Sequence, residues 1–130
     1  MDLSESAMDW VARYEAAWRA PGTGLLAGLF TPDARYVPAP FADPIRGLPA
    51  IEQMWEAERK GPDEEFVMVA DLVAASDDRA VVRLEVRYGE PNHEHYRDLW
   101  VLHLTDDGRC HAFEEWPFWP PEQPGRVAGA

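Results

Sequence analysis

Apolar residues recur at two different spacings along this chain, and the change falls near residue 61. Before it the spacing is helical, with apolar side chains every three or four positions. This pattern predicts a helix over residues 4–20 and a second helix that begins at residues 47–49 and ends before residues 61–62. Ser6 and Asp9 have the spacing of a capping box, so we expect Ser6 to cap the first helix.

The segment between the two helices is predicted to be irregular. Residues 25–30 fit a short apolar helical turn, and residues 34–37 fit a short strand. Residues 38–44 contain three prolines, which a helix interior or a central strand does not accommodate. We therefore expect a loop there, with Asp43 as a turn residue near its end.

After residue 61 the period of the pattern becomes two, which is typical of β-strands. It predicts four strands, at residues 65–74, 79–88, 95–104 and 109–116, with hairpin-length turns after the first and the third. Helices followed by antiparallel strands indicate an α+β domain. The predicted architecture is a cone-shaped barrel of about three helices packed in a curved, largely antiparallel sheet.

Length and composition narrow the class of protein. The 130 residues suit one domain, expected at residues 1–119, with a flexible Pro/Gly-rich tail at 120–130. The formal net charge of −12 argues against nucleic acid or an anionic membrane as a partner. With no apolar run of membrane-spanning length and no signal-peptide pattern, a cytoplasmic location is expected. The single cysteine, Cys110, excludes an internal disulfide.

Four segments, taken in order, resemble a known family. They are residues 13–18 (RYEAAW), 29–34 (LFTPDA), 47–51 (GLPAI) and 99–116. Together they resemble the nuclear transport factor 2-like superfamily, in its SnoaL-like branch of small bacterial proteins, over residues 5–118. The resemblance implies a cone-shaped α+β barrel with a pocket at its open end, usually paired as a homodimer through the sheet. It leaves the activity open, because this fold hosts isomerases, dehydratases, epoxide hydrolases, polyketide cyclases and non-enzymes.

Ketosteroid isomerase is the most informative member for comparison. It uses a carboxylate base together with an oxyanion pair made of a tyrosine and a neutral aspartate. The tyrosine corresponds to Tyr14. The base corresponds to Pro38, which cannot move a proton, and the aspartate falls at or beside Trp100, with Asp98 two residues earlier. Two of the three positions differ, so we do not expect ketosteroid isomerase chemistry.

Two carboxylates remain candidates for chemistry beside Tyr14. Glu115 shares a strand face with Phe113, and burial of a carboxylate would raise its pKa and make it a usable acid or base. The alternatives are a local bulge that turns Glu115 outward, or an ion pair with an arginine. Asp98 is the second candidate, and its alternatives are a salt bridge to an arginine of a neighbouring strand or exposure to solvent at the mouth of the cone. The other positions predicted to line the pocket are Trp18, Tyr36, Phe41, Trp55, Val82, Leu84, Val86, Tyr88, Trp100, Leu102 and Phe113.

The histidines invite a metal interpretation that the spacing does not support. His93 and His95 alternate on one predicted strand, with His103 and His111 further on. However, Leu99 and Trp100 occupy the positions where a cupin-like site needs a glutamate. We therefore expect no metal. The chain also lacks glycine-rich nucleotide-binding motifs, so no cofactor is expected.

Several functions stay open at this point. The first is a cofactor-independent lyase, isomerase, cyclase or hydrolase acting on a small hydrophobic or aromatic molecule. The others are a non-catalytic protein that binds such a molecule, and a dimeric interaction module. Leu99, Val101 and Trp116 are predicted to lie on the outer face of the sheet, where they would form an apolar patch. We therefore expect a homodimer through the sheet.

Overall fold

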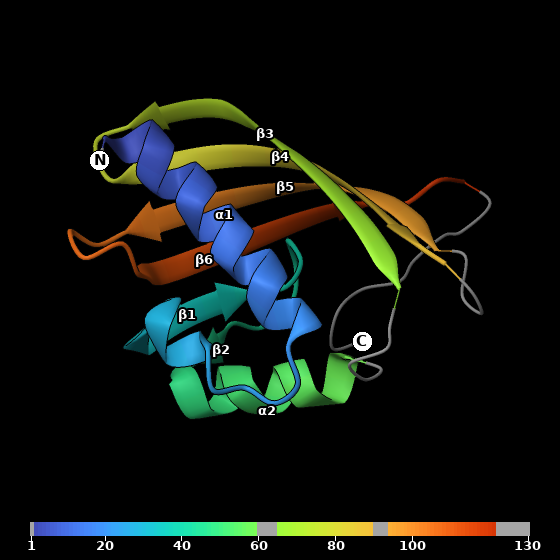
Figure 1. Cartoon of the computed structure of the whole chain (residues 1–130), viewed down its shortest axis with the longest axis horizontal. Coiled ribbons are helices and arrows are strands. Elements are labelled where there is room, and N and C mark those ends of the chain that lie inside the picture. The colour runs from blue at the N-terminus through green and yellow to red at the C-terminus, as the bar shows by residue number, and fades with distance from the viewer. Residues whose placement is uncertain (1, 60–64, 90–93, 122–130) are drawn as a thin grey trace.

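The computed structural model describes residues 2–59, 65–89 and 94–121. Within these ranges, two α-helices and one short 3-10 turn accompany a single six-stranded sheet of order β2-β1-β6-β5-β4-β3 (Figure 1). The pairing of β1 with β6 is parallel, whereas the other neighbouring strands are antiparallel. The predicted α+β class with a largely antiparallel sheet is confirmed. The elements are α1 (Leu3–Arg19), η1 (Leu26–Gly28), β1 (Phe30–Val37), β2 (Ile45–Arg46), α2 (Leu48–Glu58), β3 (Phe66–Ser76), β4 (Arg79–Tyr88), β5 (His95–Leu104) and β6 (Cys110–Phe118).

Helix α1 lies across one face of the curved sheet (Figure 1). Its first turn is capped by Asp2, whose Oδ1 accepts a hydrogen bond from the Glu5 amide at 2.8 Å. The expectation that Ser6 caps the helix is wrong, because Leu3 already packs against the core and extends the helix by one turn. The buried stripe of α1 consists of Ala7, Trp10, Val11, Tyr14 and Ala17.

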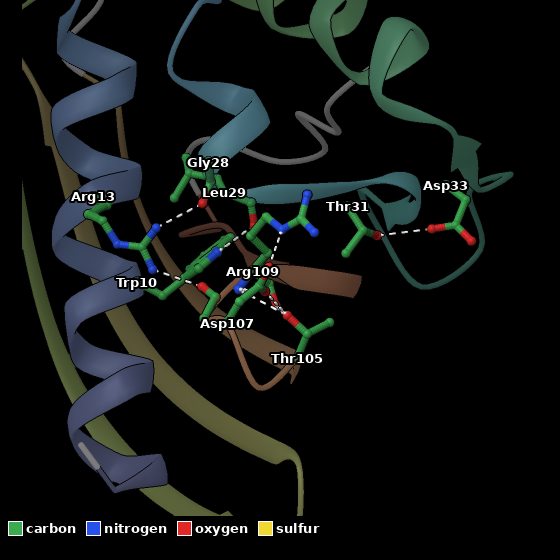
Figure 2. Close-up of polar contacts among 10 residues, drawn as sticks. Trp10, Arg13, Gly28, Leu29, Thr31, Asp33, Thr105, Asp107 and Arg109 are labelled. Carbon is green, nitrogen blue, oxygen red and sulfur yellow. Dashed lines mark hydrogen bonds and ion pairs between the residues drawn. The ribbon is translucent and has the colours of Figure 1, made fainter.

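Two side chains anchor α1 to the rest of the molecule (Figure 2). Trp10 is fully buried, and its indole Nε1 donates to the Leu29 carbonyl at 2.8 Å. One turn along, Arg13 donates to the carbonyl of Gly28 at 2.9 Å and to that of Gly108 at 2.8 Å. The helix is thereby fixed both to η1 and to the turn between β5 and β6.

Helix α2 is joined to the end of α1 through one arginine. Gly47 precedes the helix with φ of 89°, a backbone conformation that favours glycine. At the other end, the Arg59 guanidinium donates to the carbonyls of Ala17, Ala20 and Gly22 at 3.3, 2.7 and 2.8 Å. The Ala17 carbonyl belongs to the last turn of α1, and those of Ala20 and Gly22 follow it, so Arg59 holds the C-terminal end of α1 against α2.

The predicted strand bounds are most accurate for the antiparallel strands in the second half of the chain. Strands β4 and β5 match the predicted bounds, while the predicted 34–37 strand extends back to Phe30. The pattern did not reveal β2, because two residues are too short to show a period. None of the helices among the described residues is long and apolar enough to span a membrane.

One residue placed in the pocket by sequence is on the surface instead. Phe41 is fully exposed, with a relative accessibility of 103%. It lies in the proline-rich loop between β1 and β2, where strand alternation gives no information about direction. The expectation that Phe41 lines the interior is therefore wrong.

Strand β6 contains a bulge that matters for both of its faces. His103 of β5 pairs with Ala112, whereas the next residue, Leu104, pairs with Cys110. His111 is therefore an extra residue without a partner position on β5. Before the bulge Cys110 is buried, and after it Phe113 is buried, so the alternation changes phase there.

Substitution of buried and exposed aromatic residues tests this account of the core. We expect Trp10→Ala to lower the free energy of unfolding by about 3–5 kcal/mol, since it leaves a large cavity and removes one of the two hydrogen bonds that the Leu29 carbonyl accepts. Phe41→Ala is the matched control and should change it by less than about 0.5 kcal/mol. Urea unfolding followed by fluorescence measures both. Equal losses for the two variants would contradict the assigned core.

Candidate active site

Aromatic rings from both helices and the sheet meet in the interior. Tyr14 of α1 contacts Trp100 of β5, with ring centroids 4.4 Å apart, and Trp55 of α2, at 4.9 Å. Tyr36 of β1 packs on Phe113 of β6 at 4.6 Å. The five rings are buried, so a polar group among them is largely screened from water.

Two carboxyl groups point into this aromatic interior. Asp98 of β5 is 1% exposed, and Glu115 of β6 retains partial exposure. The register pairs Trp100 with Glu115 and Asp98 with Pro117, so the two acidic residues are diagonal neighbours on one face of the sheet. The phase change at the β6 bulge is what directs Glu115 inward with Phe113.

The carboxyl groups belong to a hydrogen-bonded chain of side chains. The Asp98 and Glu115 carboxyl groups lie close enough to share a proton, and a shared proton would supply the partner that the buried Asp98 Oδ1 otherwise lacks among the described residues. Glu115 Oε1 accepts from the Tyr36 hydroxyl at 3.2 Å, and the hydroxyls of Tyr36 and Tyr14 are 3.4 Å apart. Asp98 Oδ2 accepts from the Trp100 indole at 3.1 Å. The structure therefore brings the three catalytic candidates, Tyr14, Glu115 and Asp98, into one network.

A hydrogen bond between two carboxyl groups requires that one of them carries a proton. Burial, followed by the charge of Glu115, raises the pKa of Asp98 well above its ordinary value. Burial also raises the pKa of Glu115, while hydrogen bonds from Asp98 and Tyr36 act in the opposite direction. We therefore assign the proton to Asp98 and the charge to Glu115 when the pair holds a single proton.

The tyrosines of the network stay neutral donors. Burial is the main reason that the pKa values of Tyr14 and Tyr36 lie well above the usual value near 10. Tyr36, which sequence reasoning treated only as a lining residue, is the one that contacts Glu115 directly. Alternation placed it inward, but no local signal pairs residues that are 79 positions apart.

The other residues predicted to line the pocket, apart from Phe41, form two groups that differ in burial. Most are buried, whereas Trp18 and Tyr88 are half-buried. Trp18 contacts Trp55 with ring centroids 4.7 Å apart, and Tyr88 lies near Tyr96 and Phe66 at the far end of the strands. Whether these side chains touch a ligand stays a prediction. The buried group comprises Tyr36, Trp55, Val82, Leu84, Val86, Trp100, Leu102 and Phe113.

The histidines lie away from this network. His93 is outside the described residues, and His95 Nε2 is 3.1 Å from Glu85 on the outer side of β4. Among the described residues, Asp78, His103 and His111 form a group with the composition of a metal site, on the outer face of the sheet. Cys110 is buried, and burial raises the pKa of its thiol to about 12, so it is not an activated nucleophile.

The sequence of most of the domain matches one family. The family profile of the SnoaL-like domain matches residues 11–112. The chain belongs to the SnoaL-like family. This match confirms the resemblance to the nuclear transport factor 2-like superfamily. A search of curated proteins finds no match to the sequence of this chain.

Solved structures of several proteins share this fold, and the activities in their names differ. A putative polyketide cyclase from Sinorhizobium meliloti is 25% identical, with a TM-score of 0.63 over 82% of this chain and 93% of that one. The epoxide hydrolase/cyclase-like enzyme SalBIII, with a role in pyran ring formation in salinomycin, is 18% identical, with a TM-score of 0.68 over 93% and 96%. A steroid delta-isomerase from Pseudomonas aeruginosa is 22% identical, with a TM-score of 0.63 over 90% and 82%.

The shared proton predicts how stability depends on pH. Free Asp and Glu titrate near pH 4, but the folded pair keeps a proton above that pH. Between pH 4 and the raised pKa, the folded chain binds more protons than the unfolded chain. The pair therefore contributes stability that falls as pH rises, by at most about 1.4 kcal/mol per pH unit for each extra proton.

Asp98→Asn tests this dependence, because an amide donates to Glu115 without titrating. We expect the free energy of unfolding of Asp98→Asn, relative to wild type, to increase between pH 4 and pH 7. Glu85 and Asp107, whose pKa values are lowered by hydrogen bonds, act in the opposite direction and cancel in this comparison. Asp106→Asn, at an exposed turn position, is the matched control. A difference that does not change with pH would exclude a shared proton.

Proposed function

We propose that this protein is a cofactor-independent acid–base enzyme acting on a small, largely apolar molecule, as an isomerase, cyclase, lyase or hydrolase. The observation that carries the proposal is the adjacent pair of carboxyl groups, Asp98 and Glu115, with Glu115 hydrogen-bonded to Tyr36 and both groups enclosed by aromatic rings. Carboxyl groups whose pKa values are raised toward neutrality are effective proton donors and acceptors at physiological pH.

In this proposal Glu115 is the proton-transferring group, because it carries the charge and is the more accessible of the two. The Glu115 carboxylate takes a proton from the substrate or from a water, and the protonated carboxyl group then returns one proton to a different atom. The protonation state of the pair is restored after each turnover. Asp98 keeps its own proton and stabilises the Glu115 charge through their hydrogen bond.

Unpaired donors indicate the kind of ligand that would fit. The indole Nε1 atoms of Trp55 and Trp119 are buried without a hydrogen-bond partner among the described residues. A buried donor left unpaired costs about 1–3 kcal/mol, which a ligand oxygen at the same place would offset. Trp55 packs against Tyr14, whose hydroxyl lies beside Tyr36. These positions favour a neutral molecule that carries a carbonyl, ether or epoxide oxygen.

A non-catalytic binding protein is the second candidate. It is favoured by Pro38, which occupies the position of the carboxylate base in ketosteroid isomerase and is buried. The same aromatic interior would then hold a hydrophobic or aromatic molecule without turnover.

Glu115→Gln separates the two candidates. With wild-type protein we would screen small apolar ketones and epoxides for binding by thermal shift and for turnover by mass spectrometry. For a converted compound, Glu115→Gln should reduce kcat by about 10²- to 10⁴-fold, the usual contribution of general acid–base catalysis.

Tyr36→Phe removes a hydrogen bond to a charged group, which is worth about 1.5–3 kcal/mol. It should therefore reduce kcat more than Tyr14→Phe does, because the Tyr14 hydroxyl reaches Glu115 only through Tyr36.

Glu114→Gln is the matched control for this experiment. Glu114 is the preceding residue on β6, lies on the opposite face and accepts a hydrogen bond from Trp116 at 2.7 Å. It should leave kcat unchanged. Compounds that bind without being converted by wild type would support the binding protein, and a Glu115→Gln variant with full turnover would rule out the proposed mechanism.

We also propose a homodimer formed through the outer face of the sheet. Trp116 and Phe118 of β6 are 39% and 55% exposed there, and the neighbouring β5 residues Leu99 and Val101 are half-buried. Leu99 pairs directly with Trp116, so these side chains form one patch rather than scattered exposures. Contiguous exposed apolar surface of this kind commonly marks an interface.

Trp116→Ser tests the dimer because it removes the largest side chain of the patch. Wild type should sediment as a dimer at micromolar concentration, and Trp116→Ser should shift the population toward monomer. Val73→Ser, at a 51% exposed position on β3, is the control and should leave the oligomeric state unchanged. A monomeric wild type would contradict the proposal.

A further inference from the structure

A second cluster of polar side chains lies on the outer face of the sheet, separate from the carboxyl pair. His103 of β5, His111 of β6 and Asp78 of the turn between β3 and β4 each offer one ligand atom. These three atoms lie within 4.8 Å of one another. His111 Nε2 is 4.0 Å from Asp78 Oδ2, and the two imidazole rings meet edge to face with centroids 5.6 Å apart.

Backbone features place these side chains together. The β6 bulge makes His111 the extra residue beside the His103–Ala112 pair, on the outer face. The Asp78 carbonyl accepts a hydrogen bond from the Leu104 amide at 2.9 Å, which ties the β3–β4 turn to the residue after His103. The cluster therefore joins the β3–β4 turn to the β5–β6 hairpin.

We propose that Asp78, His103 and His111 bind a divalent transition-metal ion, and that this ion is Zn²⁺. Two imidazole nitrogens and one carboxylate oxygen form a donor set that suits Zn²⁺. With metal–ligand distances of about 2.0–2.2 Å, neighbouring ligand atoms in a tetrahedral site are about 3.3 Å apart. The three atoms need to approach by about 1.5 Å at most, which small side-chain rotations provide.

The surroundings leave space for the ion and a further ligand. A hollow of about 300 Å³ adjoins the cluster and is lined by both histidines together with Arg35, Val101 and Glu114. Three protein ligands leave a fourth position open toward this hollow. The centre of the proposed dimer patch, Trp116 and Phe118, lies in the C-terminal part of β6, whereas His111 lies near its start, and Val101 borders both the patch and the hollow.

Charged neighbours act in both directions on the bound ion. Asp78 and Glu114 favour a cation, whereas Arg79, whose Nε is 3.9 Å from Asp78 Oδ1, opposes it. An imidazole ring with one unprotonated nitrogen donates the lone pair of that nitrogen to a metal, so both histidines can serve as ligands.

Calorimetric titration of the full chain with Zn²⁺ tests the site. The titration is made at pH 7.5 in excess Mg²⁺, which occupies carboxylate-only sites but not imidazoles. We expect one Zn²⁺ per chain. His103→Ala and His111→Ala should each weaken binding by at least about tenfold, since even changes outside the ligand set often cost 10- to 100-fold. Asp78→Asn should also weaken it.

Two further variants guard against indirect effects. His95→Ala removes a histidine from the other end of β5, where it contacts Glu85, and should bind Zn²⁺ as wild type does. Arg79→Gln should bind Zn²⁺ more tightly, an outcome that loss of folding cannot produce. The proposal is overturned if wild type does not bind, if His103→Ala binds equally well, or if one ion is shared by two chains.

Discussion

The packing of α1 against the curved sheet is the contact on which the rest of the structure depends. Trp10 fills the space between helix and sheet, and its indole bond to the Leu29 carbonyl fixes the depth of α1. Arg13 fixes the same helix to the turn before β6. Tyr14, one turn from Trp10, is thereby held over Trp100 and Phe113. The helix that stabilises the core also supplies a donor to the polar network.

The same burial determines the chemistry of the two acidic side chains. In water, Asp98 and Glu115 would both be ionised at neutral pH, but Asp98 is buried among aromatic rings, where a second negative charge beside Glu115 is costly. No arginine or lysine pairs with either carboxyl group among the described contacts. Retention of a proton is the remaining way to accommodate the pair, and this makes it available for transfer to a ligand.

Periodicity predicted more of the fold than of the site. The period-two pattern of residues 79–88 and 95–104 gave the bounds of β4 and β5, because long strands with one buried face show it clearly. It also placed Glu115 on the same strand face as Phe113. It could not give the Tyr36–Glu115 contact, which depends on the parallel pairing of β1 with β6, nor the exposure of Phe41, which lies in a loop.

The bulge at His111 links the two faces of β6. Had the alternation continued from buried Cys110, Ala112 and Glu114 would face the interior, and Phe113 and Glu115 would lie outside. The single extra residue reverses the phase, so Phe113 and Glu115 turn inward while His111 stays on the outer face beside His103. A bulge was expected to turn Glu115 away from the interior if one occurred. Because it precedes Phe113, it has the opposite effect, and one inserted residue sets both the carboxyl pair and the histidine pair.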